Sequence, residues 1–480
     1  MSRENRPEGS RVRTGTPTGA AAPAEPRRPV RPARRQEPKT AREVALYILY
    51  HVDTRKAFAD LLLTQSLKEG ALETRDAALV TEMVNGTLRW RARLDWILGR
   101  YVRVGLDTLP PWIRNILRLG LYQILFLDRV PPHAAVDESV KLARVHGHAG
   151  IAGLVNAVLR KILKDRESLP DPEQTLADRG EGLSIAYSHP RWLVERWIRR
   201  LGEDEARKLL AANNRPAVLC LRVNPGRTDR ETLRRALEAR GIVTEAGPLS
   251  RLSLRVSGNL VPAQVPEFLE GHFFVQDESE TLVGELLGAE PGETVLDLCA
   301  APGGKAAHIQ EGRRSHGLVL AVDGQRNRIP RIRENIARMG LENVHPILAD
   351  GRRFALARPV DRVLVDAPCS GLGVLGRRAD ARWRKTEASM RALLPLEEEL
   401  LEAGSAWVKP GGVLVYSVCS TEPEEGLNLV RAFLQRHPEF RPEDAAGFVP
   451  AEAVSDGWIL LYPHRHGTDG AFAARMRRIP

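Results

Sequence analysis

The feature that most limits the fold of this chain is an alternation of short apolar runs and helix-like stretches that begins after Gly292. Each apolar run has the length of a β-strand, and a glycine-rich turn follows the first run directly. This order is typical of a doubly wound, Rossmann-like α/β sheet. The five expected strands are residues 294–298, 318–322, 344–348, 362–365 and 413–418.

The part of the chain before this sheet predicts two further folded units. Thr40 and Glu43 form a T-x-x-E capping box ahead of an apolar helix face, and helix patterns without strands continue to about residue 165. We therefore expect an all-helical bundle, followed by a small α+β module with alternating helix and strand patterns. The expected boundaries are a basic arm at 1–38, the bundle at 40–165, a linker at 166–182, the module at 183–275 and the sheet domain at 276–480.

Composition limits the class of protein and its compartment. No stretch reaches the roughly 18 uncharged apolar residues of a membrane span, and the arginine-rich start lacks the apolar core of a secretory signal. Four cysteines are too few for a disulfide framework, so we expect a soluble cytoplasmic protein. The net charge of +10 suggests a polyanionic partner. Half of that excess lies in residues 1–38, which either attract phosphates or act as a solubilising tail.

The glycine-rich turn is the first candidate site. It follows a strand and opens a helix, where open α/β sheets bind ligands, although such a turn can also be purely structural. Asp323, at the end of the next strand, can accept hydrogen bonds from both hydroxyls of a ribose. The missing G-x-G-x-x-G motif disfavours a dinucleotide pyrophosphate, so an adenosine without phosphates fits best. Asp350 can accept from an adenine amino group or simply cap its strand. The candidate cofactor-binding residues are Cys299, Ala300, Ala301, Pro302, Gly303, Gly304, Lys305, Asp323, Asp350 and Asp366.

Two cysteines at the ends of later strands are the candidate catalytic residues. Carbon 5 of cytosine is a poor nucleophile, but a thiolate that adds to carbon 6 creates an enamine that can take a methyl group. A base must then remove the carbon 5 proton, a task suited to a second thiol or a water. Cys369 and Cys419 fit these two half-reactions, while Asp366 can bind the ring and Lys305 can favour the thiolate. Each cysteine could instead be a small buried apolar residue, which is our interpretation of Cys220.

Residues 294–420 resemble the RNA cytosine-5 methyltransferases of the NOL/NOP/Sun family through DLCAAPGGK, VDGQRNR, ADGR, DAPCSGLG and SVCS. The resemblance extends to LRVN, QDESE and DGAF. It implies S-adenosyl-L-methionine as the cofactor, Cys419 as the nucleophile and Cys369 as the residue that assists release.

The helical part resembles the NusB fold through RDAALVTEMVNGTLRW, IRNILRLGLYQILFL, PPHAAVDESVKLAR and GLVNAVLRKI. That fold binds RNA. The resemblance as a whole implies a multi-domain protein with an N-terminal all-α NusB-like bundle, an RRM-like α+β module and a C-terminal Rossmann-like methyltransferase domain. It further implies a bacterial enzyme that methylates 16S ribosomal RNA, with no metal and no membrane partner, and we expect a monomer.

The candidate RNA contacts are less distinctive. Arg377, Arg378, Arg382 and Trp383 form a basic stretch with one aromatic, which suits phosphates and a stacked base but also fits a solvated surface. Arg222 and Asn224 are further candidates that a charged strand end explains nearly as well.

Two alternative functions stay open at this stage. The chain could be an RNA-binding assembly factor that uses the methyltransferase fold as a scaffold, although the pair of cysteines argues against this. It could also methylate cytosine in another RNA, such as transfer RNA or 23S ribosomal RNA.

Overall fold

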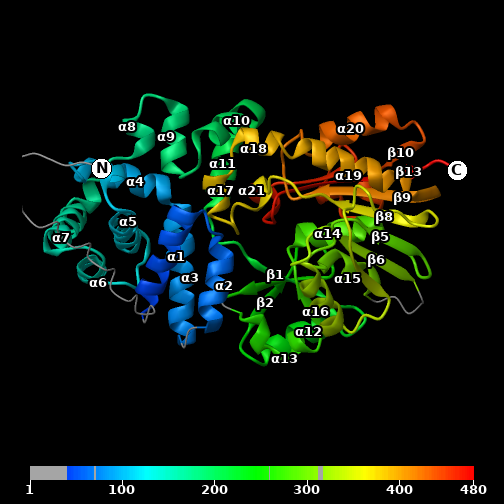
Figure 1. Cartoon of the computed structure of the whole chain (residues 1–480), viewed down its shortest axis with the longest axis horizontal. Coiled ribbons are helices and arrows are strands. Elements are labelled where there is room, and N and C mark those ends of the chain that lie inside the picture. The colour runs from blue at the N-terminus through cyan, green and yellow to red at the C-terminus, as the bar shows by residue number, and fades with distance from the viewer. Residues whose placement is uncertain (1–39, 70–71, 259, 312–316) are drawn as a thin grey trace, which may run out of the picture. The chain divides into compact units, whose positions relative to one another are not determined.

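The computed structural model describes residues 40–69, 72–258, 260–311 and 317–480, whose course is shown in Figure 1. The basic arm expected at residues 1–38 lies outside the described residues. None of the helices in the described part of the chain is long and apolar enough to cross a membrane.

The first described part of the chain is a bundle of α-helices without strands between residues 40 and 164, apart from the undescribed residues 70–71. The predicted capping box is present at its start, since the Thr40 side chain accepts from the backbone of Glu43 and the Glu43 side chain accepts from that of Thr40. The helices are α1 (Ala41–Arg55), α2 (Ala59–Glu69), α3 (Thr74–Arg89), α4 (Arg91–Tyr101), η1 (Leu106–Thr108), α5 (Pro111–Phe126), α6 (Pro132–His146) and α7 (Ala149–Lys164).

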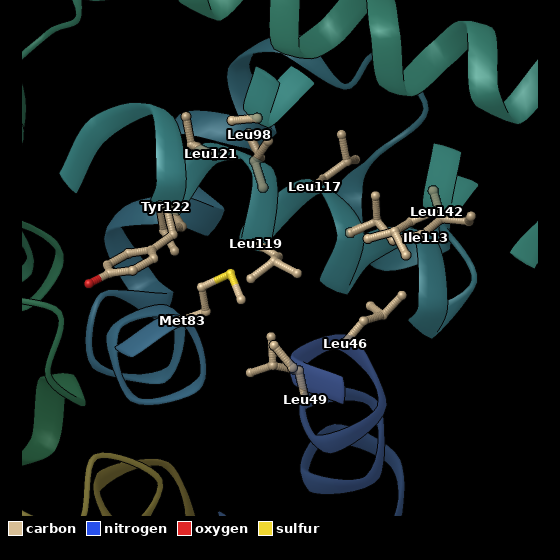
Figure 2. Packing of buried hydrophobic residues seen from close by; sticks show 14 of the residues in the cluster. Leu46, Leu49, Met83, Leu98, Ile113, Leu117, Leu119, Leu121, Tyr122 and Leu142 are labelled. Carbon is tan, nitrogen blue, oxygen red and sulfur yellow. The ribbon is translucent and has the colours of Figure 1, made fainter. Parts of the chain in front are cut away.

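The core of this bundle forms around α5, which is buried on almost all sides. Figure 2 shows its Leu117 and Leu119 among Leu46 and Leu49 of α1 and Met83 of α3, all of them buried. The bundle therefore has a hydrophobic core of its own, as expected of an independent folding unit.

A group of shorter helices follows the bundle. The segment 166–182, which we expected to be a linker, contains helical turns that begin at the aspartate caps Asp171 and Asp178. Of these, α9 packs against both α4 and α10, so the segment is folded against its neighbours rather than extended. The elements are η2 (Arg166–Ser168), α8 (Pro172–Thr175), α9 (Arg179–Ala186), α10 (Arg191–Leu201) and α11 (Glu203–Asn213).

The small α+β module is an antiparallel sheet with the strand order β2-β3-β1-β4. Its apolar side chains, including Leu233 and Leu237 of α12, form a separate core. The elements are β1 (Leu219–Val223), α12 (Arg230–Glu238), β2 (Val243–Ala246), β3 (Ser253–Ser257), η3 (Pro262–Gln264), α13 (Pro266–Leu269) and β4 (Phe273–Val275).

The C-terminal part contains a nine-stranded mixed sheet with the path β11-β12-β13-β9-β8-β5-β6-β7, in which β10 pairs with β13. The five strands predicted from the apolar runs are the parallel ones, β7, β6, β5, β8 and β9.

The strands of this sheet are β5 (Thr294–Asp297), β6 (Leu318–Asp323), β7 (Val344–Leu348), β8 (Val360–Asp366), β9 (Val408–Val418), β10 (Phe440–Glu443), β11 (Val454–Ser455), β12 (Trp458–Leu461) and β13 (Ala471–Arg478). The helices are α14 (Glu278–Leu287), α15 (Gly304–Gln310), α16 (Ile329–Met339), η4 (Leu372–Val374), α17 (Ala381–Arg384), α18 (Glu387–Arg391), α19 (Leu394–Ala406), α20 (Leu427–Arg436), η5 (Ala445–Gly447), η6 (Ala451–Ala453) and α21 (Pro463–His466).

The order of the parallel strands places the candidate site. The chain runs outward from β5 through β6 to β7, then returns to add β8 and β9 on the other side of β5. The order therefore reverses between β5 and β8, and ligands of such sheets bind beyond the carboxyl ends of the strands at this point. Asp297, Asp323 and Asp366 stand at those carboxyl ends.

Candidate active site

The glycine-rich turn joins β5 to α15 and is held by hydrogen bonds to the neighbouring strand. The Ala300 amide donates to the Val322 carbonyl at 2.9 Å, and the Ala301 amide donates to Asp323 at 3.3 Å. Gly303 has a φ of +98°, a conformation that favours glycine. The turn thus brings its backbone close to the ends of β5 and β6, where a ligand can approach it.

Three carboxyl groups converge beside this turn. Asp297 is fully buried, and burial, followed by the charge of Asp366, raises its pKa well above the ordinary value. Asp323 is also buried and accepts from the backbone amides of Ala301 and Gln325. This acidic surrounding disfavours a pyrophosphate and suits a ligand with a positive charge and hydroxyl donors.

Asp350 lies just beyond β7 and is more exposed than these acids. Its two carboxylate oxygens are both engaged by the guanidinium of Arg352, at 2.7 and 2.9 Å. The side chain of Arg352 lowers the pKa of Asp350, so the residue is a carboxylate that already has a partner. A contact to adenine would use its remaining acceptor capacity.

The two candidate catalytic cysteines lie together at the ends of β8 and β9. Cys369 Sγ and Cys419 Sγ are 3.3 Å apart, and both side chains are half-buried. The hydrogen bond from Cys369 lowers the pKa of Cys419, and the charges of Lys305 and Arg378 act in the same direction. The same hydrogen bond, together with burial, raises the pKa of Cys369. The pair therefore favours a thiolate at Cys419 beside a protonated thiol at Cys369.

Lys305 and Asp366 connect the glycine-rich turn to the cysteine strands. Lys305, in the first turn of α15, forms an ion pair with Asp366 at 2.8 Å and a second one with Glu280. The other oxygen of Asp366 accepts from the Ser417 hydroxyl at 2.7 Å. Residues from α14, α15, β8 and β9 thus converge at one edge of the sheet.

The prediction that Arg222 and Asn224 contact RNA is corrected by their burial. Arg222 is completely buried, forms an ion pair with Glu311, and donates to the Gly304 carbonyl at 2.7 Å. Asn224 is 2% exposed and donates to the Gly271 carbonyl. Because both side chains face the interior, they cannot meet a phosphate. Arg222 instead fastens the start of α15 to the small module.

Arg382 was also predicted as an RNA contact, and its burial corrects that prediction too. It is completely buried, and burial, followed by the charge of Arg89, lowers its pKa to about 9. All of its hydrogen-bond acceptors are uncharged oxygens of the protein: the carbonyls of Arg89, Ser188, Asn213 and Leu375 and the side-chain oxygen of Asn214. Arg382 therefore joins the helical bundle and the helices that follow it to the catalytic domain.

The rest of the predicted basic stretch divides into two groups. Trp383 donates to the Leu88 carbonyl of the bundle at 2.7 Å, and Arg377 pairs with Asp277 and Asp469. Their polar groups are thus engaged inside the protein. Arg378 differs, because its charge acts on Cys419 and places it on the active-site side.

The structure adds acidic residues that the sequence patterns did not single out. Glu280 pairs with Lys305, and Glu425 accepts hydrogen bonds from Ser370 and Ser420, the residues that follow the two cysteines. Glu280 lies inside the QDESE motif, so the sequence did contain a pattern that could have pointed to it. Glu425 follows Cys419 by six residues within a run of exposed-looking acids and had no comparable signal.

The fold and the converging groups define a class: an α/β methyltransferase with two cysteines beside its cofactor turn. Three family models match the chain: NusB family at residues 39–164, the RsmF/B-like ferredoxin-like domain at 189–262, and 16S rRNA methyltransferase RsmB/F at 285–477.

Individual relatives cover most of the chain. A Bacillus subtilis (strain 168) protein named probable ribosomal RNA small subunit methyltransferase B is 36% identical, over 92% of this chain and 99% of its own length. A protein of the same name from Synechocystis sp. (strain ATCC 27184 / PCC 6803 / Kazusa) is 35% identical over the same shares. The crystal structure of PH0851 matches with a TM-score of 0.75 and 28% identity, over 93% of this chain and all of that chain.

This chain therefore belongs to the RsmB/F family of 16S rRNA methyltransferases. It is an enzyme of the S-adenosylmethionine-dependent class, built from the three domain types expected from the sequence.

Proposed function

We propose that this protein transfers the methyl group of S-adenosylmethionine to carbon 5 of a cytosine in 16S ribosomal RNA, through a covalent bond between Cys419 and carbon 6. The observation that carries this proposal is the Cys369–Cys419 pair, 3.3 Å apart at the sheet edge where cofactors of this fold bind. Since carbon 5 methylation needs both a nucleophile and a group that helps it leave, two thiols in contact suit the reaction.

The residues at the sheet edge fit the cofactor. The buried carboxyl group of Asp323 suits the hydroxyls of a ribose and a nearby positive charge, and Gly303 lets the backbone approach. When bound, S-adenosylmethionine supplies an electrophilic methyl group.

Different residues of this chain then act on the cytosine base in successive steps. The Cys419 thiolate adds to carbon 6, and the electron pair displaced onto the ring makes carbon 5 the nucleophile. Asp366 accepts a hydrogen bond from the cytosine amino group, while Lys305 donates to Asp366 and helps to hold the base. After methylation a base removes the carbon 5 proton and the carbon 6–sulfur bond breaks. The Cys369 thiol then donates a hydrogen bond to the departing Cys419 thiolate.

The substrate assignment rests on family membership. The bundle matches the NusB family, and we propose that it binds the RNA while the sheet domain carries out the transfer. We propose a monomer that acts in the cytoplasm, where ribosomal RNA is found in bacteria such as those that hold its relatives.

The test is a cysteine substitution with a matched control. Cys419→Ala should lower tritiated methyl transfer to unmethylated 16S RNA by about a thousandfold or more, while cofactor binding measured by calorimetry is retained. Cys220→Ala is the control, because Cys220 is buried in the small sheet and burial raises its pKa to about 12. Unchanged transfer by Cys419→Ala would refute the nucleophile, and preferred transfer to 23S or transfer RNA would refute the substrate.

A further inference from the structure

Glu425 is a buried carboxylate behind both cysteine loops. It is completely buried, and its oxygens accept from the Ser370 amide at 2.6 Å, the Ser370 hydroxyl at 2.5 Å and the Ser420 hydroxyl at 2.5 Å. Ser370 directly follows Cys369, and Ser420 directly follows Cys419. One carboxylate thus holds the residues next to both thiols.

Other contacts fix Glu425 and the two loops in place. The Tyr416 hydroxyl donates to the Glu425 carbonyl at 2.7 Å, and the Gly373 amide donates to the Cys419 carbonyl at 3.1 Å. Because each serine is bonded directly to its cysteine in the chain, a shift of either serine would move the neighbouring sulfur. The 3.3 Å separation of the sulfurs therefore depends on the hydrogen bonds that Ser370 and Ser420 donate to Glu425.

A second buried acid lies beside Glu425. Glu397 of α19 is completely buried, and burial, followed by the charge of Glu425, raises its pKa to about 9. Glu397 is therefore neutral near pH 7. Glu425 accepts from three donors, which compensate for its removal from water. These three donors come from Ser370 and Ser420, which belong to the cysteine loops.

We propose that Glu425 is a positioning residue that clamps the Cys369 and Cys419 loops together, so that the Cys369 thiol reaches the Cys419 sulfur. The inference deepens the proposed function and rests on it. Glu425 acts through Ser370 and Ser420 and has no contact with the reacting base.

The charges around the thiols allow the clamp to be distinguished from a purely electrostatic effect. Lys305 and Arg378 favour a Cys419 thiolate, Asp366 opposes it, and the charge of Glu425 opposes a Cys369 thiolate. If Glu425 acted only through its charge, removing that charge would make the thiols easier to ionise. Loosening the clamp would have the opposite effect on Cys419, because the hydrogen bond from Cys369 is what most lowers its pKa.

The experiment is the pH dependence of iodoacetamide alkylation at Cys419, read by peptide mass spectrometry on the full chain without RNA. Glu425→Gln should move the Cys419 profile to higher pH, whereas Glu422→Gln should leave it in place. Glu422 is a matched control, because it is a buried acid near Glu425 whose side chain binds Arg196 and Trp197 instead of Ser370 and Ser420. A Glu425→Gln profile that is unchanged or moves to lower pH, or an equal rise with Glu422→Gln, would overturn the clamp.

Kinetics and a double-mutant cycle complete the test. Glu425→Gln should lower kcat for methyl transfer by roughly 10- to 100-fold and leave KM for RNA within about threefold. In a Ser370→Ala, Ser420→Ala background only the backbone amide of residue 370 still donates to Glu425, so Glu425→Gln should have a smaller further effect. A full additional loss would refute action through the serines. The alkylation readout needs no RNA, so it tests the clamp even if Cys419→Ala retains transfer and the proposed function fails.

Discussion

The carboxyl edge of the parallel strands and the segment 377–385 are both polar and both looked functional, but they use their polar groups differently. At the edge, Cys369 and Cys419 stay half-exposed, and their neighbours are arranged around them. In the segment, Arg382 donates to carbonyls of the bundle, of the helices that follow it and of the catalytic domain. The topology of a sheet predicts where strand ends meet, whereas a basic stretch does not reveal whether its acceptors are RNA phosphates or the chain's own backbone.

The largest expected effect would test the catalytic half of this comparison. Cys369→Ala should lower turnover by about 100-fold or more, because the leaving thiolate loses its hydrogen-bond donor, and a covalent protein–RNA complex should accumulate. Denaturing gel electrophoresis with labelled RNA measures the complex. Cys369→Ala combined with Cys419→Ala should give none. Native turnover without a trapped complex would show that Cys369 has no part in release.

A stability measurement would test the structural half. Arg382→Met should lower the free energy of unfolding by about 3 to 5 kcal/mol, because several buried carbonyls lose their donor. Urea titration measures this free energy. Arg391→Met is the control, because Arg391 is exposed and its replacement should change the free energy of unfolding by no more than about 0.5 kcal/mol. The salt dependence of RNA binding by the folded variant should stay native. Native stability with a reduced salt slope would restore the RNA-contact interpretation.

The pH dependence of stability examines the acids behind the catalytic edge. The pKa of Glu397 is raised from 4.5 to about 9 in the folded protein. Its contribution to stability is therefore complete below pH 4.5 and is lost as the pH rises toward 9, by at most about 1.4 kcal/mol per pH unit. Between pH 5 and 8, the native protein should lose roughly 4 kcal/mol more stability than Glu397→Gln. Glu398→Gln, on the exposed side of α19, is the control. Equal pH dependence in all three proteins would contradict burial of Glu397 as a neutral acid.

The smallest effect concerns the one residue of the basic stretch that acts on the catalytic edge. Arg378→Ala should move the alkylation profile of Cys419 slightly to higher pH, because the charge of Arg378 is a minor cause of the lowered pKa of Cys419. RNA affinity should fall by less than about tenfold, as expected for one phosphate contact. A shift as large as that of Lys305→Ala would show that the segment belongs to the catalytic centre after all.

The predicted parallel strands agree with the observed ones because each is a short apolar run. β5, β6, β8 and β9 are largely buried inside the sheet, whereas β7 is an edge strand that stays partly exposed. Residues 344–348 coincide with β7, while β8 and β9 begin earlier than expected. The antiparallel strands β10 to β13 were not anticipated. β13 carries three arginines, and burial of Arg475 becomes favourable only when Glu443 of β10 and the Leu286 and Leu287 carbonyls approach it.

The sequence by itself determined the three domain types, the strand ends that carry Asp297, Asp323, Asp366 and the two cysteines, and the kind of chemistry that such residues can perform. Local order along the chain suffices for this, because parallel strands bring their carboxyl ends to one edge. Only the tertiary structure decided that Arg222 and Arg382 are buried and bind other parts of the protein. It also decided that Glu425 accepts hydrogen bonds from both cysteine loops. These outcomes depend on partners up to 293 residues away, and whether a charged group meets water or a distant partner is settled only when the chain is packed.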